Sequence, residues 1–174
     1  MTEKTWTLPD GVYTALVTPF ADGKVDRQAW RTLVERQLAA GVSGLVPVGC
    51  TGEAATLDRG EREWLVKACV EMAAGRAVVV AGSGSNSTAV TVAQTRDVLD
   101  WGADAAMLIS PYYNKPQQHG LVAHYREVAR AVDIPIVLYN VPGRTAVNIL
   151  PETAAQLAAE PNIVALKEAS GDLG

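Results

Sequence analysis

Cysteine is scarce in this sequence. Its 174 residues include only Cys50 and Cys69, and these two do not form a CxxC pair. A framework of disulfide bonds is therefore not expected. This cysteine usage is typical of proteins in a reducing cytoplasm, and we expect a cytoplasmic location.

Long apolar runs and runs of one charge are also missing. No apolar stretch approaches the roughly 20 residues that cross a bilayer, and the first residues, MTEKTWTLPDG, lack the apolar core of a signal peptide. The 15 basic and 19 acidic residues are scattered and give a net charge of −4. We therefore expect neither a membrane nor a nucleic acid as a partner.

Apolar residues are abundant, which indicates a globular protein with a large core. Hydrophobic residues make up 48% of the chain and charged residues 20%, as in ordinary globular domains. The length is that of one domain, and we expect residues 1–174 to form a single domain.

Short apolar runs alternate with longer helical patterns along the chain. Because the runs are apolar at consecutive positions, they predict strands of a parallel sheet that is covered on both faces. The expected strands are Val12–Val17, Gly44–Val48, Ala77–Ala81, Ala105–Ile109, Ile136–Tyr139 and Ile163–Leu166. The expected helices are Asp26–Ala40, Asp58–Ala74, Ser87–Trp101, Gln118–Ala131 and Pro151–Ala159.

The ends of several expected helices carry recognisable signals. Asp26 and Ser87 are residue types that cap helix N-termini, and Pro151 suits a first helical turn. Gly41, Gly75 and Gly102 follow three of the helices, as a left-handed C-terminal cap requires. The strands recur about every 25–35 residues, the size of a βαβ unit. The pattern fits a (β/α)8 barrel or a doubly wound sheet and does not choose between them.

Polar and glycine-rich segments follow the expected strands, where sites are built in parallel α/β proteins. Gly49–Glu53 is either an anion-binding turn or a plain tight turn. Gly82–Ser87 lacks the third glycine of a dinucleotide-binding loop, and a nucleotide site is disfavoured. The tyrosines of Ser110–Pro116 are, in isolation, more typical of packing than of catalysis.

Two cations at strand ends are candidates for chemistry. Lys167 is either a desolvated nucleophilic amine at the mouth of a barrel or a lysine that reaches out to solvent. Arg144 is either a bidentate clamp for a carboxylate or an ordinary surface arginine. His119 and His124 lie five residues apart on one expected helix, without a cluster of carboxylates, so no metal site is expected.

Taken together, the motifs are much more specific than any one of them. Their order along the chain is VTPF, GxTGE, PYYNKP, YNVPGRT and LKEASGD. In this order the sequence resembles the dihydrodipicolinate synthase family, which is related to N-acetylneuraminate lyase among the pyruvate-dependent class I aldolases. The resemblance covers essentially the whole chain and implies a (β/α)8 barrel of which only about the first six strands and five helices are present.

The resemblance also implies roles for individual residues. Lys167 matches the lysine that forms an imine with pyruvate, and Tyr139 matches the tyrosine that shuttles protons to it. Thr51, next to the backbone of Gly52, matches the residue that binds the pyruvate carboxylate. Tyr113 matches a proton-relay tyrosine contributed across a dimer interface, which implies a homo-oligomer.

The implied reaction condenses pyruvate with L-aspartate 4-semialdehyde in lysine (diaminopimelate) biosynthesis. Arg144 matches the arginine that binds the carboxylate of the semialdehyde. The chemistry needs a free amine, proton transfer and carboxylate binding, so neither a metal nor an organic cofactor is expected. Two alternatives stay open: a sister aldolase for another 2-oxo acid, and a truncated barrel that acts only as an assembly.

The sequence departs from the family in three respects. The family usually has threonine where Cys50 stands, bridging the relay tyrosines, and a thiol is the weaker hydrogen bonder. The lysine-feedback site is only partly matched. Its matching residues are Asn86 and Tyr112, and its departures are Ala54, Arg59, Arg62 and Val90. A full barrel needs about 250 residues; if Gly174 is the natural end, we expect the open strand edges to drive self-association.

Overall fold

The computed structural model describes residues 6–172, and the chain divides into two compact units. The first unit consists of Pro9–Gly82 and Asp97–Ala105. Within the described residues, the second unit consists of Ser83–Arg96 and residues 106–172, together with residues 6–8. The expectation of a single domain stays a prediction.

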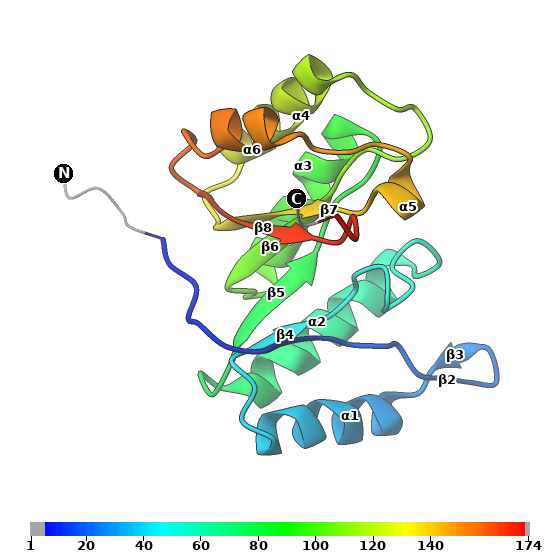
Figure 1. The fold of residues 1–174 in the computed structure, drawn as a ribbon. Coiled ribbons are helices and arrows are strands. Elements are labelled where there is room, and N and C mark those ends of the chain that lie inside the picture. Colours follow the sequence, from blue (N-terminus) through cyan, green and yellow to red (C-terminus); the bar gives the residue numbers. More distant parts are fainter. Residues whose placement is uncertain (1–5, 173–174) are drawn as a thin grey trace. The chain divides into compact units, whose positions relative to one another are not determined.

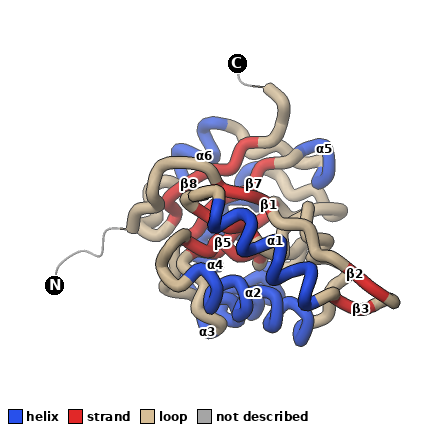
Figure 2. The backbone as a smooth tube through the Cα atoms, turned by 90° about the horizontal axis from the view of Figure 1, so that it is seen from below, coloured by secondary structure: helices blue, strands red, loops and turns tan. Residues whose placement is uncertain are grey.

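The first unit has a parallel sheet with two long helices. The strands pair in the order β1 (Tyr13–Ala15), β4 (Gly44–Val46) and β5 (Val78–Gly82). Helices α1 (Arg27–Ala39) and α2 (Arg59–Ala73) connect these strands and pack against each other (Figures 1 and 2). The fully buried side chains of this unit include Trp30, Val34, Leu45 and Leu65, and Cys69 of α2 lies among them.

A small hairpin that the apolar pattern does not predict also belongs to the first unit. It pairs β2 (Phe20–Ala21) with β3 (Lys24–Val25) and stands out beside α1 (Figures 1 and 2). Its two turn residues, Asp22 and Gly23, have φ of 52° and 72°. Two positive φ values in succession are the geometry of a tight hairpin turn, for which Asp-Gly is a favoured pair.

The helices begin and end where the sequence signals them. The carboxylate of Asp26 accepts hydrogen bonds from the backbone N–H groups of Gln28 and Ala29, and Asp58 forms a reciprocal capping box with Glu61. The expected C-terminal glycines have left-handed backbones, with φ between 74° and 88°. These glycines are Gly41, Gly75 and Gly102.

The second unit has a parallel sheet ordered β6 (Ala105–Ile109), β7 (Ile136–Asn140) and β8 (Ile163–Glu168). Helices α4 (Gln118–Ala131) and α6 (Pro151–Leu157) pack side by side (Figure 1). Helix α3 (Thr88–Asp100) lies mostly in this unit. All five residues of β7 are buried, as its continuous apolar run predicts.

The second unit differs from the sequence-based expectation in one additional helix and in the length of its last strand. A four-residue helix, α5 (Pro142–Thr145), follows β7 and begins with the proline at its first position. Strand β8 extends to Glu168, so Lys167 lies within the strand rather than after it. Lys167 is thereby fixed by sheet hydrogen bonds on the backbone rather than placed on a loop.

Candidate functional site

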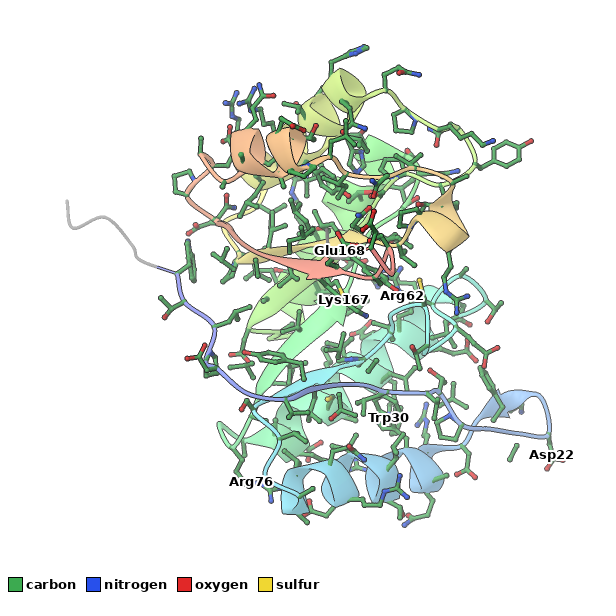
Figure 3. The ribbon with its side chains drawn as sticks, in the orientation of Figure 1. Asp22, Trp30, Arg62, Arg76, Lys167 and Glu168 are labelled. Atoms are coloured by element: carbon green, nitrogen blue, oxygen red, sulfur yellow. The ribbon has the colours of Figure 1, made fainter. Side chains whose placement is uncertain are left out.

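Lys167 and Tyr139 occupy opposite positions on neighbouring strands. The register pairs Tyr139 of β7 with Lys167 of β8, and residues paired in this way project from the same face of the sheet. The Lys167 Nζ atom lies 4.1 Å from the centroid of the Tyr139 ring (Figure 3 labels Lys167 on its strand). The ring is 6% exposed. The half-buried Lys167 therefore places its amine against a buried aromatic ring.

An irregularity in β8 sets this register. Ile136 pairs with Ile163, whereas the next residue, Val137, pairs with Ala165. Val164 is therefore an extra residue on the β8 side, which is the definition of a β-bulge. Because side chains alternate between the faces of a strand, one extra residue moves everything after it to the opposite face. The bulge is what places Lys167 on the face of Tyr139.

The backbone of Tyr139 is held from the neighbouring strand end. Its carbonyl oxygen accepts hydrogen bonds from Ser110 N at 3.2 Å and Ser110 Oγ at 3.5 Å. Tyr125 donates from its hydroxyl to Ser110 Oγ at 3.1 Å. Burial raises the pKa of Tyr125, so the phenol stays protonated and able to donate. Neither Ser110 nor Tyr125 was identified as a site residue from the sequence.

Arg144 lies on α5, immediately beyond β7, and its side chain is exposed. The turn that carries it is built by Thr145, whose buried hydroxyl donates to the carbonyl oxygens of Val141 and Val147. Ala146 closes the helix in the left-handed conformation, with φ of 57°. A rigid turn beside the strand end presents a guanidinium suited to bidentate carboxylate binding.

Tyr113 projects from the loop that follows β6. Its side chain is 89% exposed and its φ is 72°, an unusual value for a residue other than glycine. The loop is fastened beside it, because Asn114 Nδ2 donates to the carbonyl oxygen of Asn86 at 3.1 Å. Packing within the chain, the plainer interpretation of this tyrosine, does not account for so exposed a phenol.

Cys50, Thr51 and Gly52 belong to the first unit and follow β4 in a tight turn. Gly52 N and Ala54 N both donate to the carbonyl oxygen of Gly49, at 3.1 and 3.2 Å. The Thr51 side chain is exposed and that of Cys50 is half-buried. A side chain at Gly52 would place its first carbon 3.0 Å from the main-chain oxygen of Leu16, a tight contact that favours glycine there.

The entry to this turn is strained. Val48 is buried and has φ of 49°. A β-branched residue in the left-handed region is an outlier, at a cost of about 1–3 kcal/mol. Thr18 supports the turn by donating from its buried hydroxyl to the carbonyl oxygen of Gly52 at 2.7 Å. Strain held in place by such contacts is characteristic of ligand-binding turns.

The structure thus places every candidate residue at or just beyond the C-terminal end of a strand. Lys167 and Tyr139 are in contact, and Arg144 and Tyr113 follow strands of the same sheet. Within residues 6–172, no group of three or more histidine, cysteine or acidic side chains is arranged to hold a metal ion. No helix in the described part of the chain is long and apolar enough to cross a membrane.

Comparison with known proteins connects this arrangement to one family. The sequence profile of the dihydrodipicolinate synthetase family matches residues 8–174. A 4-hydroxy-tetrahydrodipicolinate synthase from Hyphomonas neptunium is 54% identical over 163 residues, which is 94% of this chain and 56% of the relative. The chain thus spans somewhat more than half the length of the curated relatives it matches.

Solved structures agree with the sequence comparison. The dihydrodipicolinate synthase of Thermotoga maritima matches with a TM-score of 0.94 at 45% identity, over 95% of this chain and 57% of that one. The chloride-inhibited enzyme of Acinetobacter baumannii, complexed with pyruvate, matches with a TM-score of 0.93 at 46% identity, over 96% and 57% of the two chains. The fold is therefore of the (β/α)8 barrel type rather than a doubly wound sheet, and this chain holds an incomplete barrel.

Proposed function

The chain belongs to the dihydrodipicolinate synthetase family, and from this premise we propose that it carries the Schiff-base centre of a 4-hydroxy-tetrahydrodipicolinate synthase. The observation that carries the proposal is the placement of Lys167, whose Nζ lies 4.1 Å from the centroid of the buried Tyr139 ring. The fixed strand backbone of β8 supports the role of Lys167 as the amine that forms an imine with pyruvate.

The proposed reaction begins with attack of the Lys167 amine on the C2 carbonyl carbon of pyruvate, and water leaves as the imine forms. Loss of a proton from the methyl group gives an enamine, whose terminal carbon attacks the aldehyde carbon of L-aspartate 4-semialdehyde. The amino group of this second substrate then adds to the imine carbon, closes the ring and releases Lys167. These steps need proton transfer and anion binding but no metal ion or organic cofactor.

The other candidate residues supply those needs. Tyr139 is proposed to move protons to and from the forming imine, and its contact with Lys167 supports this role. Thr51, with the backbone of Gly52, is proposed to bind the pyruvate carboxylate. Arg144 is proposed to bind the carboxylate of the semialdehyde, which its exposed position on a rigid turn supports. Cys50 is proposed to stand at the bridging position of the proton relay.

Tyr113 extends the proposal to a homo-oligomer. An 89% exposed tyrosine on a fastened loop suits insertion into a second copy of the protein, where it would complete the proton relay. We propose a cytoplasmic enzyme, because its substrates are metabolites of central metabolism and amino-acid biosynthesis. The free thiols of Cys50 and Cys69 are consistent with a reducing compartment.

The test is a condensation assay with pyruvate and a panel of aldehydes. The proposal predicts that L-aspartate 4-semialdehyde is the preferred acceptor and that Arg144→Ala lowers its turnover more than that of an aldehyde without a carboxylate. A preference for another aldehyde would indicate a sister aldolase. Imine formation with pyruvate but no condensation with any aldehyde would restrict this chain to the first half of the reaction.

A further inference from the structure

Behind the contact between Lys167 and Tyr139 lies a second pair of residues on the same two strands. Asn140 and Glu168 are the next residues along β7 and β8, and the register pairs them with each other. Because successive side chains of a strand alternate between faces, this pair projects from the opposite face. Asn140 Nδ2 donates to Glu168 Oε2 at 2.8 Å. This hydrogen bond joins the strands one residue beyond the reactive pair.

Asn140 is 1% exposed, and both its amide oxygen and its amide nitrogen form hydrogen bonds within the chain. Its Oδ1 atom accepts from the backbone N–H of Ile149 at 3.0 Å. Because a backbone N–H can only donate, this bond fixes the orientation of the amide and leaves Nδ2 as the donor. Nδ2 then donates both to Glu168 and to Asn148 Oδ1, the latter at 2.7 Å.

The segment that Asn140 contacts is fastened a second time, from α4. Gln118 Nε2 donates to the carbonyl oxygen of Asn148 at 2.8 Å, and Gln118 Oε1 accepts from Leu150 N at 3.2 Å. Both ends of the stretch between β7 and Leu150 are therefore held. That stretch includes α5 and Arg144. Asn140 thus joins three parts: the end of β7, the end of β8 and the anchored turn after α5.

Glu168 is suited to its place in this network. The side-chain hydrogen bond from Asn140 is the main cause that lowers the pKa of Glu168, and the Ser170 hydroxyl and backbone lower it further. The carboxylate therefore stays ionised, and the bond from Asn140 is charge-assisted, a class about twice as strong as neutral hydrogen bonds. The exposed Glu168, next to Lys167 in the sequence, thereby adds a side-chain hydrogen bond between β7 and β8.

We propose that Asn140 is a positioning residue: through Glu168 and Asn148 it holds the strand ends in the register that keeps Lys167 against Tyr139. The inference rests on the proposed imine chemistry of Lys167. Asn140 faces away from the reacting atoms, so it acts on the reaction only through the backbone of its two neighbours. Loss of the amide donor lets the ends of β7 and β8 separate, and displacement of a reacting group by about 1 Å lowers a rate by about 100-fold.

The test reverses the polarity of the hydrogen bond. Asn140→Asp places two carboxylates together and removes the donor, while Asn140→Asp with Glu168→Gln restores one donor and one acceptor across the strands. Asn148 is exposed and its amide can turn to donate to the new aspartate. The readout is the rate at which pyruvate and borohydride label Lys167, measured from low to saturating pyruvate. We expect the saturated rate to fall about 10- to 100-fold in the single variant and to recover in the double variant.

Asn162→Ala is the matched control. Asn162 is a second buried asparagine, which donates to the carbonyl oxygens of Ala129, Val132 and Ile134 just before β8 begins. Its loss lowers stability at the far end of the strand and should leave the saturated labelling rate unchanged. If Asn140→Asp does not fold, Glu168→Ala removes the same bond from its exposed side and should slow labelling.

The outcomes separate the two proposals. Unlabelled Lys167 in the folded wild-type protein overturns the proposed function itself. Wild-type labelling with an undiminished rate in Asn140→Asp or Glu168→Ala overturns the positioning role alone. A double variant no faster than Asn140→Asp, or a loss of labelling in Asn162→Ala as large as in Asn140→Asp, also overturns it. Recovery in the double variant with a silent control supports it.

Discussion

The Nζ atom of Lys167 lies 4.1 Å from the centroid of the Tyr139 ring. This contact bears on the charge that the Lys167 nitrogen carries in the proposed reaction. The face of an aromatic ring attracts a cation, and the protonated imine with pyruvate is a cation centred near the same place. In the proposed reaction the ring and the hydroxyl of Tyr139 therefore have separable tasks: the ring faces the charged nitrogen, and the hydroxyl is proposed to transfer protons.

Tyr139→Phe separates these two tasks. The variant keeps the ring and loses the hydroxyl, so we expect pyruvate still to label Lys167 in the presence of borohydride. Condensation turnover should fall by about 100- to 10,000-fold, the usual contribution of a positioned acid or base. Tyr139→Leu, which removes both, should impair labelling as well. Equal labelling in the two variants would show that the ring has no part in imine formation.

Cys50→Thr tests the proposed proton relay. The thiol is a weaker hydrogen bonder than the hydroxyl that the family usually has at this position, and Cys50 is half-buried at the turn after β4. We expect the threonine to raise turnover by no more than about 10,000-fold, the upper range of acid–base effects. Steady-state kinetics of the two proteins measure the difference. Unchanged or lower turnover would mean that the thiol is an adapted part of the relay.

Free lysine is expected not to bind. Of the residues that differ from the family's feedback site, Val90 offers no acceptor for an ammonium group, and Arg59 is engaged elsewhere. Its guanidinium pairs with Asp97 at 2.8 Å and with Glu63 at 3.5 Å, and lies over the Trp101 ring. An unpaired, buried ammonium costs several kcal/mol. Calorimetric titration should detect no saturable binding at about millimolar lysine; clear saturation would reject this expectation.

The stability of the fold should depend on the charge of His124. Its side chain is buried on α4, with Nδ1 3.0 Å from Thr88 Oγ1, and desolvation lowers the pKa of His124 from 6.5 to about 4. Between these values the unfolded chain binds a proton that the folded chain does not. The free energy of unfolding should therefore decrease as pH falls from about 6.5 to about 4, by at most about 3 kcal/mol from this group.

Chemical denaturation at several pH values measures this dependence. His124→Gln should remove the part of the slope that His124 causes. His119→Gln, an exposed position on the same helix, is the control and should leave the slope unchanged. An unaltered slope in His124→Gln would show that another group governs acid unfolding.

Sequence periodicity was sufficient to predict the main strands and helices. It was not sufficient to predict the β7–β8 register, which places Lys167 against Tyr139. The run Ile163-Val164-Ala165-Leu166 is apolar throughout, so it carries no alternation from which the bulge at Val164 could be read. Yet this bulge decides whether Lys167 shares a face with Tyr139. The β2–β3 hairpin, in contrast, had a usable signal in Asp22-Gly23, a favoured pair for tight turns.

The Asn140 network shows a second limit. Its amide bonds to residues 8, 9 and 28 positions along the chain, and no local pattern signals such partners. The motif YNVPGRT directs attention to Tyr139 and Arg144, while the asparagine between them gives no local hint of a role. Candidate residues could therefore be chosen from the sequence, whereas the contacts that position them required the fold.

The assignment of Lys167 as the Schiff-base lysine is tested by the mass of the peptide that contains Lys167 after treatment of the folded protein with pyruvate and borohydride. We expect the stable mass of a reduced pyruvate adduct on Lys167, absent without pyruvate and absent in Lys167→Arg. Lys115, on the loop after β6, is an internal control that should stay unmodified. An unmodified Lys167 in the folded protein, or an adduct on Lys115 alone, would contradict the assignment of Lys167 as the Schiff-base lysine.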